Sequence, residues 1–306
     1  MRRGYLYGLS AYALWGFFPL YFTLLQPSGA VEVLAHRVIW SVLFLAAVLT
    51  VSADWRFVAR IARQPRLLGG ITLAASVLAV NWATYVYGVN SERVVETALG
   101  YFINPLVTVL LGVLVLGERL RRAQWAAVGV GALAVLVLTI DYGHVPYIAL
   151  TLAVTFGSYG LTKKQLGIPA THGLFVESAV LLLPCLGYAA WLSWRSEATF
   201  GSVSAGHTLL LVGAGAVTAI PLLLFAGAAN RLPLTALGLL QYVAPMIQLG
   251  CGVLILGEPM PPARLAGFGL VWLALIIFTA DGIRRARATA AAARAPVAVT
   301  AGRAAP

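Results

Sequence analysis

A few ionisable side chains lie inside long apolar segments of this chain, where a charge is costly and is therefore a functional candidate. Arg37 is the clearest of them, because it lies near the start of the apolar segment 33–52. One interpretation is a cationic anchor for an anionic or carboxylate-bearing substrate. The other is a structural arginine that snorkels outward or pairs with a carboxylate. The residue type alone leaves both interpretations open.

Three further ionisable residues are candidates for proton uptake and release. Glu177 lies near the start of the apolar segment 172–194. It could be a coupling carboxylate, or an acid that the helix dipole favours near a helix N-terminus. His36 could titrate near neutral pH, although a histidine on an apolar face also serves as a hydrogen-bonded core residue. Glu32 and His36 are close neighbours of Arg37 in the sequence, so they join Glu177 as candidates.

Amides, hydroxyls and aromatic rings also interrupt the apolar segments. They could line a polar cavity that recognises a substrate by hydrogen bonds. Alternatively, they could join helices, at about 0.6 kcal/mol per hydrogen bond. With the arginine included, the cavity candidates are Arg37, Asn81, Trp82, Tyr85, Asn104, Thr108, Gln241, Tyr242 and Gln248. Pro105 and Pro245 are hinge candidates, because each removes a backbone donor and frees the carbonyl four residues earlier.

The elements that position these side chains are long apolar segments. Of the 306 residues, 60% are hydrophobic and only 10% are charged, and the mean hydropathy is +0.89. Too few charges are present to cover a water-soluble fold of this size, which argues against a soluble enzyme or a disordered chain. We expect an all-α membrane protein with ten spans of roughly 20 residues, at 4–25, 33–52, 67–89, 97–117, 123–140, 145–162, 172–194, 207–229, 234–256 and 265–280.

The positive charges predict an orientation for these spans. With the N-terminus inside, the inner ends and loops hold 17 of the 21 Lys and Arg residues and the outer loops hold three. This bias predicts a cytoplasmic N-terminus and C-terminus. It also accounts for the net charge of +11 without nucleic acid as a partner.

Two segments of the chain resemble each other. Residues 105–118 read PLVTVLLGVLVLGE and residues 245–258 read PMIQLGCGVLILGE, with seven of fourteen positions identical. The offset of 140 residues covers five spans, and an odd number inverts the second copy in the membrane. The sequence therefore predicts a first repeat at 1–141, a second at 142–282, and a basic, disordered cytoplasmic tail at 283–306.

Several motifs resemble those of one transporter family. They are LAHRVIWS at 34–41, Asn81-Trp82, ETALGYFINPL at 96–106, LGER at 116–119, and Gln241-Tyr242 with Pro245. This pattern is similar to the RarD family of EamA-type proteins in the drug/metabolite transporter superfamily. The resemblance implies ten helices in two inverted five-helix EamA repeats and a permease of the bacterial plasma membrane. The family name is linked to chloramphenicol sensitivity, which does not identify the solute of this chain.

A secondary-active transporter that moves a small organic metabolite or drug-like solute by alternating access fits these features best. A passive channel is the main alternative, although no selectivity-filter sequence or ring of like charges favours one. A membrane enzyme is a weaker alternative, because the three aspartates are isolated and no metal-ligand motif occurs. We expect a small solute and the lipid bilayer as partners, with no metal and no cofactor. The sequence does not specify the oligomeric state.

Overall fold

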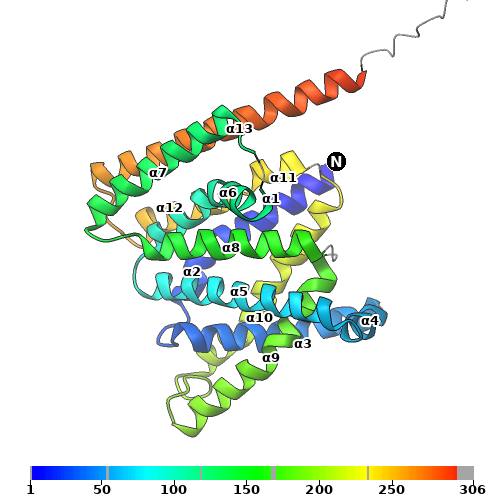
Figure 1. Cartoon of the computed structure of the whole chain (residues 1–306). Helices are drawn as coiled ribbons and strands as arrows, with labels where there is room; N and C mark the ends of the chain where they lie inside the picture. The colour runs from blue at the N-terminus through cyan, green and yellow to red at the C-terminus, as the bar shows by residue number, and fades with distance from the viewer. Residues whose placement is uncertain (1, 53–54, 118, 167–169, 233, 295–306) are drawn as a thin grey trace, which may run out of the picture.

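The computed structural model describes residues 2–52, 55–117, 119–166, 170–232 and 234–294, and these ranges are helical apart from short connections (Figure 1). The elements are α1 Arg2–Gly16, α2 Phe18–Thr23, α3 Ala30–Ser52, α4 Arg56–Ala62, α5 Pro65–Asn90, α6 Val94–Leu116, α7 Arg122–Tyr142, α8 Tyr147–Leu166, α9 Ala170–Trp194, α10 Ala205–Ala229, α11 Leu234–Leu240, α12 Val243–Gly250, the π-helix η1 Cys251–Ile255 and α13 Pro262–Arg294.

Within the described residues, eight segments are long and apolar enough to cross a membrane. They are Ala30–Val51, Pro65–Asn90, Val94–Leu116, Arg122–Tyr142, Gly173–Trp194, Ala205–Ala229, Ala236–Ile255 and Pro262–Arg285. The other two expected spans do not meet these limits. The segment 4–25 is divided between α1 and α2, and α8 carries two lysines near its end. The chain is therefore all-helical with eight candidate spans, and the count of ten stays a prediction.

The two hinge candidates lie in different surroundings. Pro105 lies inside α6, which continues through it without interruption. Pro245 lies in the first turn of α12, just after a turn at Gln241 and Tyr242 that separates α11 from α12. Because Pro245 has no N–H to donate to the carbonyl of Gln241, the chain cannot form the hydrogen bond that would continue the helix there.

The C-terminal helix corrects one expectation. Residues 283–306 were expected to be disordered, but α13 continues to Arg294. The segment is rich in alanine and arginine, which are among the strongest helix formers, so it is helical without an apolar core around it. Residues 295–306 lie outside the described residues.

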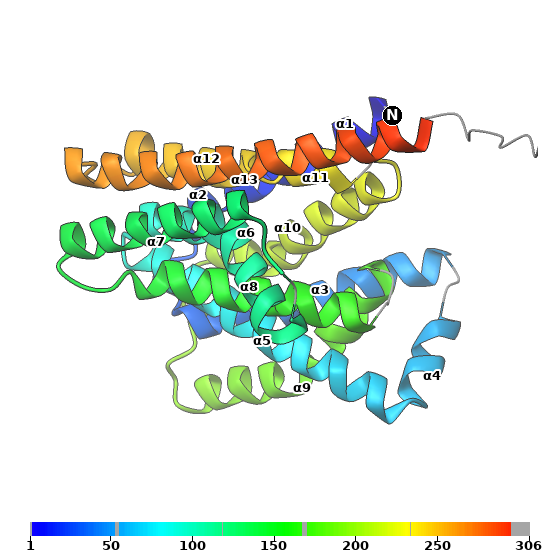
Figure 2. The ribbon, with the colours of Figure 1, turned by 45° about the horizontal axis from the view of Figure 1, so that its top comes forward.

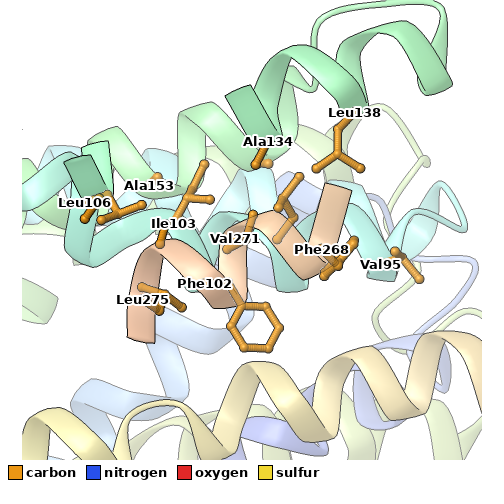
Figure 3. Close-up of a cluster of buried hydrophobic side chains, with 14 residues drawn as sticks. Val95, Phe102, Ile103, Leu106, Ala134, Leu138, Ala153, Phe268, Val271 and Leu275 are labelled. Atoms are coloured by element: carbon orange, nitrogen blue, oxygen red, sulfur yellow. The ribbon is translucent and has the colours of Figure 1, made fainter. Parts of the chain in front are cut away.

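The largest apolar core joins α6, α7, α8 and α13. Phe102 and Ile103 of α6 are buried against Phe268 of α13 and Leu138 of α7 (Figure 3). The helices α7 and α13 lie side by side in both views of the chain (Figure 2). Close packing of this kind holds the helices together through van der Waals contacts, because lipid is as apolar as the side chains themselves.

The helices α3 and α10 cross at a glycine. Gly215 is buried, and the hydroxyl of Ser41 donates to its carbonyl at 3.2 Å. A Cβ atom at position 215 would lie 2.3 Å from the carbonyl carbon of Trp40 and 2.7 Å from the backbone nitrogen of Ser41. Only a residue without a side chain allows this close approach of the two backbones.

We expect Gly215→Ala to lower the stability of the protein by about 1–3 kcal/mol, because the added methyl group has backbone atoms in its way. Gly269→Ala is the matched control, since Gly269 lies in α13 with no atom within 4 Å of an added Cβ. The thermal midpoint of the detergent-purified protein measures both variants. Equal midpoints for the two would show that the crossing of α3 and α10 does not need glycine.

Candidate functional site

A cavity of about 290 Å³ lies among the helices of the described chain. This volume is near the lower end of small-molecule sites, which run from roughly 300 to 1,000 Å³. Aromatic and aliphatic side chains form most of the wall. The lining residues are Tyr12, Trp15, Phe18, Arg37, Leu78, Asn81, Trp82, Tyr85, Tyr101, Asn104, Phe156, Tyr159, Leu174, Thr218, Leu222, Leu223, Phe225, Gln241, Ala244, Pro245 and Gln248.

Arg37 is the one charged side chain among the described lining residues. It is 2% exposed, so it does not snorkel to a surface. Its Nε donates to the hydroxyl of Thr218 at 3.1 Å, and its guanidinium carbon lies 4.6 Å from the centre of the Trp82 ring and 4.9 Å from that of Phe22. Its Nη1 is buried with no hydrogen-bond partner. Arg37 makes no ion pair with any described carboxylate. Its positive charge is stabilised by the faces of aromatic rings and is not neutralised by an anionic side chain.

Asn81 and Tyr85 of α5 both line the cavity but differ in their hydrogen bonding. The amide nitrogen of Asn81 donates to the carbonyl of Leu152 at 3.0 Å and to the hydroxyl of Thr155 at 2.9 Å. Its oxygen accepts from the hydroxyl of Tyr101 at 3.3 Å. The hydroxyl of Tyr85, in contrast, is buried without a partner. Asn81 therefore joins α5, α6 and α8, whereas Tyr85 has a free polar group.

The remaining predicted cavity residues are divided between the wall and its surroundings. Asn104, Gln241 and Gln248 line the cavity, whereas Thr108 and Tyr242 do not. Thr108 donates to the side-chain oxygen of Asn104 at 3.4 Å, and Tyr242 packs against the core of α6, α7 and α13.

Gln248 has one satisfied and one unsatisfied group. Its amide nitrogen donates to the carbonyl of Trp15 at 3.1 Å. Its side-chain oxygen is buried with no partner. The wall therefore holds a free acceptor as well as the free donor groups of Arg37 and Tyr85.

The candidates for proton exchange lie outside the lining. Glu32 accepts from the backbone N–H of Thr199 at 2.7 Å. The ring of His36 lies 3.2 Å from the indole nitrogen of Trp40 and stacks on Phe200, with 4.6 Å between ring centres. Both residues therefore join α3 to the connection between α9 and α10.

Glu177 is connected to the cavity through a tyrosine. Its side chain is 2% exposed and pairs with the ammonium of Lys163 at 2.6 Å. Its other oxygen accepts from the hydroxyl of Tyr159 at 3.0 Å, and Tyr159 is a lining residue. Within the described residues, Glu177 is thus a compensated charge one side chain away from the cavity.

Several lining residues carried no signal in the sequence. Thr218 is the most informative, because it orients Arg37 from the second half of the chain. The only indication in the sequence was that Thr218 places one hydroxyl in an apolar span, which does not distinguish it from other threonines. Tyr101 and Tyr159 also line the cavity with polar groups, but a tyrosine in a membrane segment is common enough to give no position.

Glu258 joins the two halves of the chain away from the cavity. Its carboxylate accepts from the backbone N–H groups of Val94 and Val95, the latter at 2.8 Å, at the start of α6. Burial raises the pKa of Glu258 above its usual range, while these N–H groups and the charge of Arg264 act in the opposite direction. A carboxylate at a helix N-terminus satisfies donors that the helix itself leaves free.

Comparisons with known proteins agree with this architecture. The EamA-like transporter family matches residues 2–140. A protein named Protein RarD from Streptomyces exfoliatus is 55% identical over 286 residues, which cover 94% of this chain and 91% of the relative. The uncharacterized transporter YojE of Bacillus subtilis (strain 168) is 41% identical over 291 residues, covering 94% of this chain and 97% of that protein. A solved structure described as a crystal structure of a protein covers 92% of this chain and 98% of its own, at 20% identity and a TM-score of 0.58, which supports the fold.

Together, the helices and these matches define a multi-pass membrane protein of the bacterial membrane, of the class of EamA-type transporters. Within that class, the chain belongs to the RarD family.

We expect Asn104→Ala and Gln241→Ala each to weaken solute recognition about fivefold, because one hydrogen bond contributes about 1 kcal/mol. The measurement is the half-saturating concentration, in proteoliposomes, of any solute from a metabolite panel that the wild type moves. Gln64→Ala is the control, since Gln64 is an exposed amide outside the cavity. Wild-type values for both cavity variants would remove these amides from the site.

Proposed function

We propose that the protein is a secondary-active transporter that moves a small organic solute by alternating access. The observation that carries this proposal is the cavity, whose wall combines residues from both halves of the chain. Arg37, Tyr85 and Asn104 come from residues 1–141, and Thr218 and Gln248 come from residues 142–282. A site shared between two halves can be exposed to either side as the halves rock against each other.

The helix contacts support two related halves. A shift of five spans pairs α1 with α8 and α5 with α10. Under this pairing, the contact between α5 and α8 corresponds to the contact between α10 and α1. The same shift relates α6 with α8 to α1 with α12, and α3 with α10 to α5 with α9. The repeat glycines Gly117 and Gly257 also share a left-handed backbone, with φ of 65° and 72°. These matches are those expected of an inverted repeat.

The interrupted helix α11–α12–η1 supports a moving element beside the cavity. Gln241, the first residue of its break, lines the cavity, and its last turn is a π-helix at Cys251–Ile255. Broken helices and π-turns are common where transporters bind solutes. The helix α12 packs against the uninterrupted α6 and against α1.

The arrangement of charged ends supports N-terminal and C-terminal ends in the cytoplasm of a bacterial cell. The N-terminus, α4 and the end of α13 lie toward the same side in both views (Figures 1 and 2). The sequence places arginines at all three positions, and cytoplasmic ends attract such charges. With this orientation, the contact between the Glu258 carboxylate and the start of α6 lies at the outer side.

Alternating access predicts counterflow. Proteoliposomes loaded with unlabelled solute should accumulate the labelled solute transiently above its outside concentration, because each turnover returns a loaded site. Proteoliposomes with empty lumen are the control. Uptake that only equilibrates in both preparations would favour the channel, and a panel in which no solute moves under any gradient would contradict transport.

We also propose Glu177 as the residue that couples transport to protons, with Glu32 and His36 as the weaker candidates. Lys163 and Tyr159 are the groups that contact the Glu177 carboxylate in the described structure. A proton delivered to this carboxylate would break its pairing with Lys163 and release the hydroxyl of Tyr159 at the cavity wall.

We expect Glu177→Gln to flatten the pH dependence of flux, because an amide cannot take up the coupled proton. Initial rates between about pH 5.5 and 8 in proteoliposomes measure this. Glu197→Gln is the matched control, since Glu197 forms an exposed pair with Arg195. An unchanged pH profile in Glu177→Gln would eliminate this residue as the coupling site.

A further inference from the structure

We propose that the transported solute is an apolar organic monoanion whose carboxylate binds Arg37. This inference rests on the proposed transport function and adds the chemical class of the solute. It follows from three features of the wall: its charge, its free polar groups and its apolar remainder.

The charge of the wall selects the charge of the solute. Arg37 is the only charged side chain among the described lining residues, and it makes no ion pair with a described carboxylate. A buried, uncompensated cation is costly until an anion joins it. A cationic solute would add to that cost, a zwitterion would bring an ammonium with no carboxylate to meet it, and a dianion would leave one negative charge in excess.

Two residues of the cavity wall, Arg37 and Tyr85, each have a polar group that could donate to a carboxylate. Arg37 Nη1 and the hydroxyl of Tyr85 are both buried without partners. Both side chains flank Phe22, whose ring centre lies 4.9 Å from the guanidinium carbon and 5.9 Å from the centre of the Tyr85 ring. A carboxylate has two acceptor oxygens, so one anion can satisfy both donors.

The guanidinium is held in place without losing its charge. Thr218 fixes Nε, and the faces of Trp82 and Phe22 pack against the planar group. The face of an aromatic ring attracts a cation and leaves its charge unneutralised, unlike an ion pair. The rigid fork of an arginine is suited to a planar carboxylate in such a setting.

The rest of the cavity wall is mostly apolar and can contact the apolar part of a solute. Tyr12, Trp15 and Phe225 form one aromatic cluster, with ring centres 5.4 to 6.0 Å apart. Leucines of α10 continue this surface. The free oxygen of Gln248 is an acceptor for one N–H or O–H on the solute. A cavity of about 290 Å³ with these groups fits a ring-bearing monocarboxylate.

A matched series of indoles tests the proposal on the full-length protein in detergent. The probes are indole-3-acetate, indole-3-acetamide, tryptamine and tryptophan, which share one ring and differ in charge. Isothermal titration should give at least about tenfold tighter binding of the acetate than of each of the other three, as expected for a charge-assisted hydrogen bond in a buried site. Equal or weaker binding of the acetate, or binding of none of the four, would overturn the proposal.

Arg37→Met should abolish this preference and leave the thermal midpoint unchanged or raised, because it removes an uncompensated buried charge. A purely structural Arg37 would instead give a lowered midpoint with the acetate preference retained. Arg195→Met is the control, since Arg195 is exposed and outside the cavity.

Tyr85→Phe is a second variant that removes only an unpartnered hydroxyl, so it keeps the test valid if Arg37→Met does not fold. It should weaken acetate binding about fivefold, and unchanged binding would contradict the second donor. Binding and flux are separate readouts. Anion selectivity without counterflow would overturn the transporter function, whereas counterflow without anion selectivity would overturn the monoanion.

Discussion

The absence of water in the hydrocarbon core is the constraint on which this structure depends. Each backbone N–H and C=O there has to be paired within the protein, so the described chain is built from helices. Irregular backbone is tolerated only where protein or a wet cavity surrounds it. The two places where an expected span is interrupted follow this rule, because the break before α2 is flanked by Trp15 and Phe18 and the break before α12 contains Gln241, all of which line the cavity.

The same local chemistry has different outcomes in the two repeats. Pro105 and Pro245 occupy equivalent positions, and each removes one helical hydrogen bond. The helix α6 nevertheless continues through Pro105, with its first turn bound by Glu258 and its length packed against α8. The equivalent span breaks before Pro245 into α11 and α12. A paired proline therefore does not by itself determine where a span breaks, and the sequence repeat could not show which of the two spans would.

Polarity inside an apolar span was the signal by which the sequence indicated residues that line the cavity. Arg37 and Gln248 were predicted this way, because burying either side chain in hydrocarbon costs free energy unless it faces a cavity or a hydrogen-bond partner. Thr108 shares a helix face with Asn104 but bonds to it from outside the lining. Thr218 was missed because a hydroxyl can satisfy itself on its own helix, as it does by donating to the carbonyl of Ala214 at 2.7 Å. Which way each helix is rotated depends on packing, and spacing along one helix does not encode it.

The offset of 140 residues that relates the repeats also relates Arg37 to Glu177. Both are buried charges in the second expected span of their half, but only Glu177 pairs with a described side chain of opposite charge. Glu177 has Lys163 as its counter-charge, whereas Arg37 has a threonine and aromatic rings. If both charges served packing alone, each would need a partner, since an unpaired buried ion lowers stability and an apolar side chain of similar size would not. The asymmetry distinguishes the two proposed roles: a proton can break the pair that Glu177 already has with Lys163, whereas the unpartnered group of Arg37 is free to meet an anion.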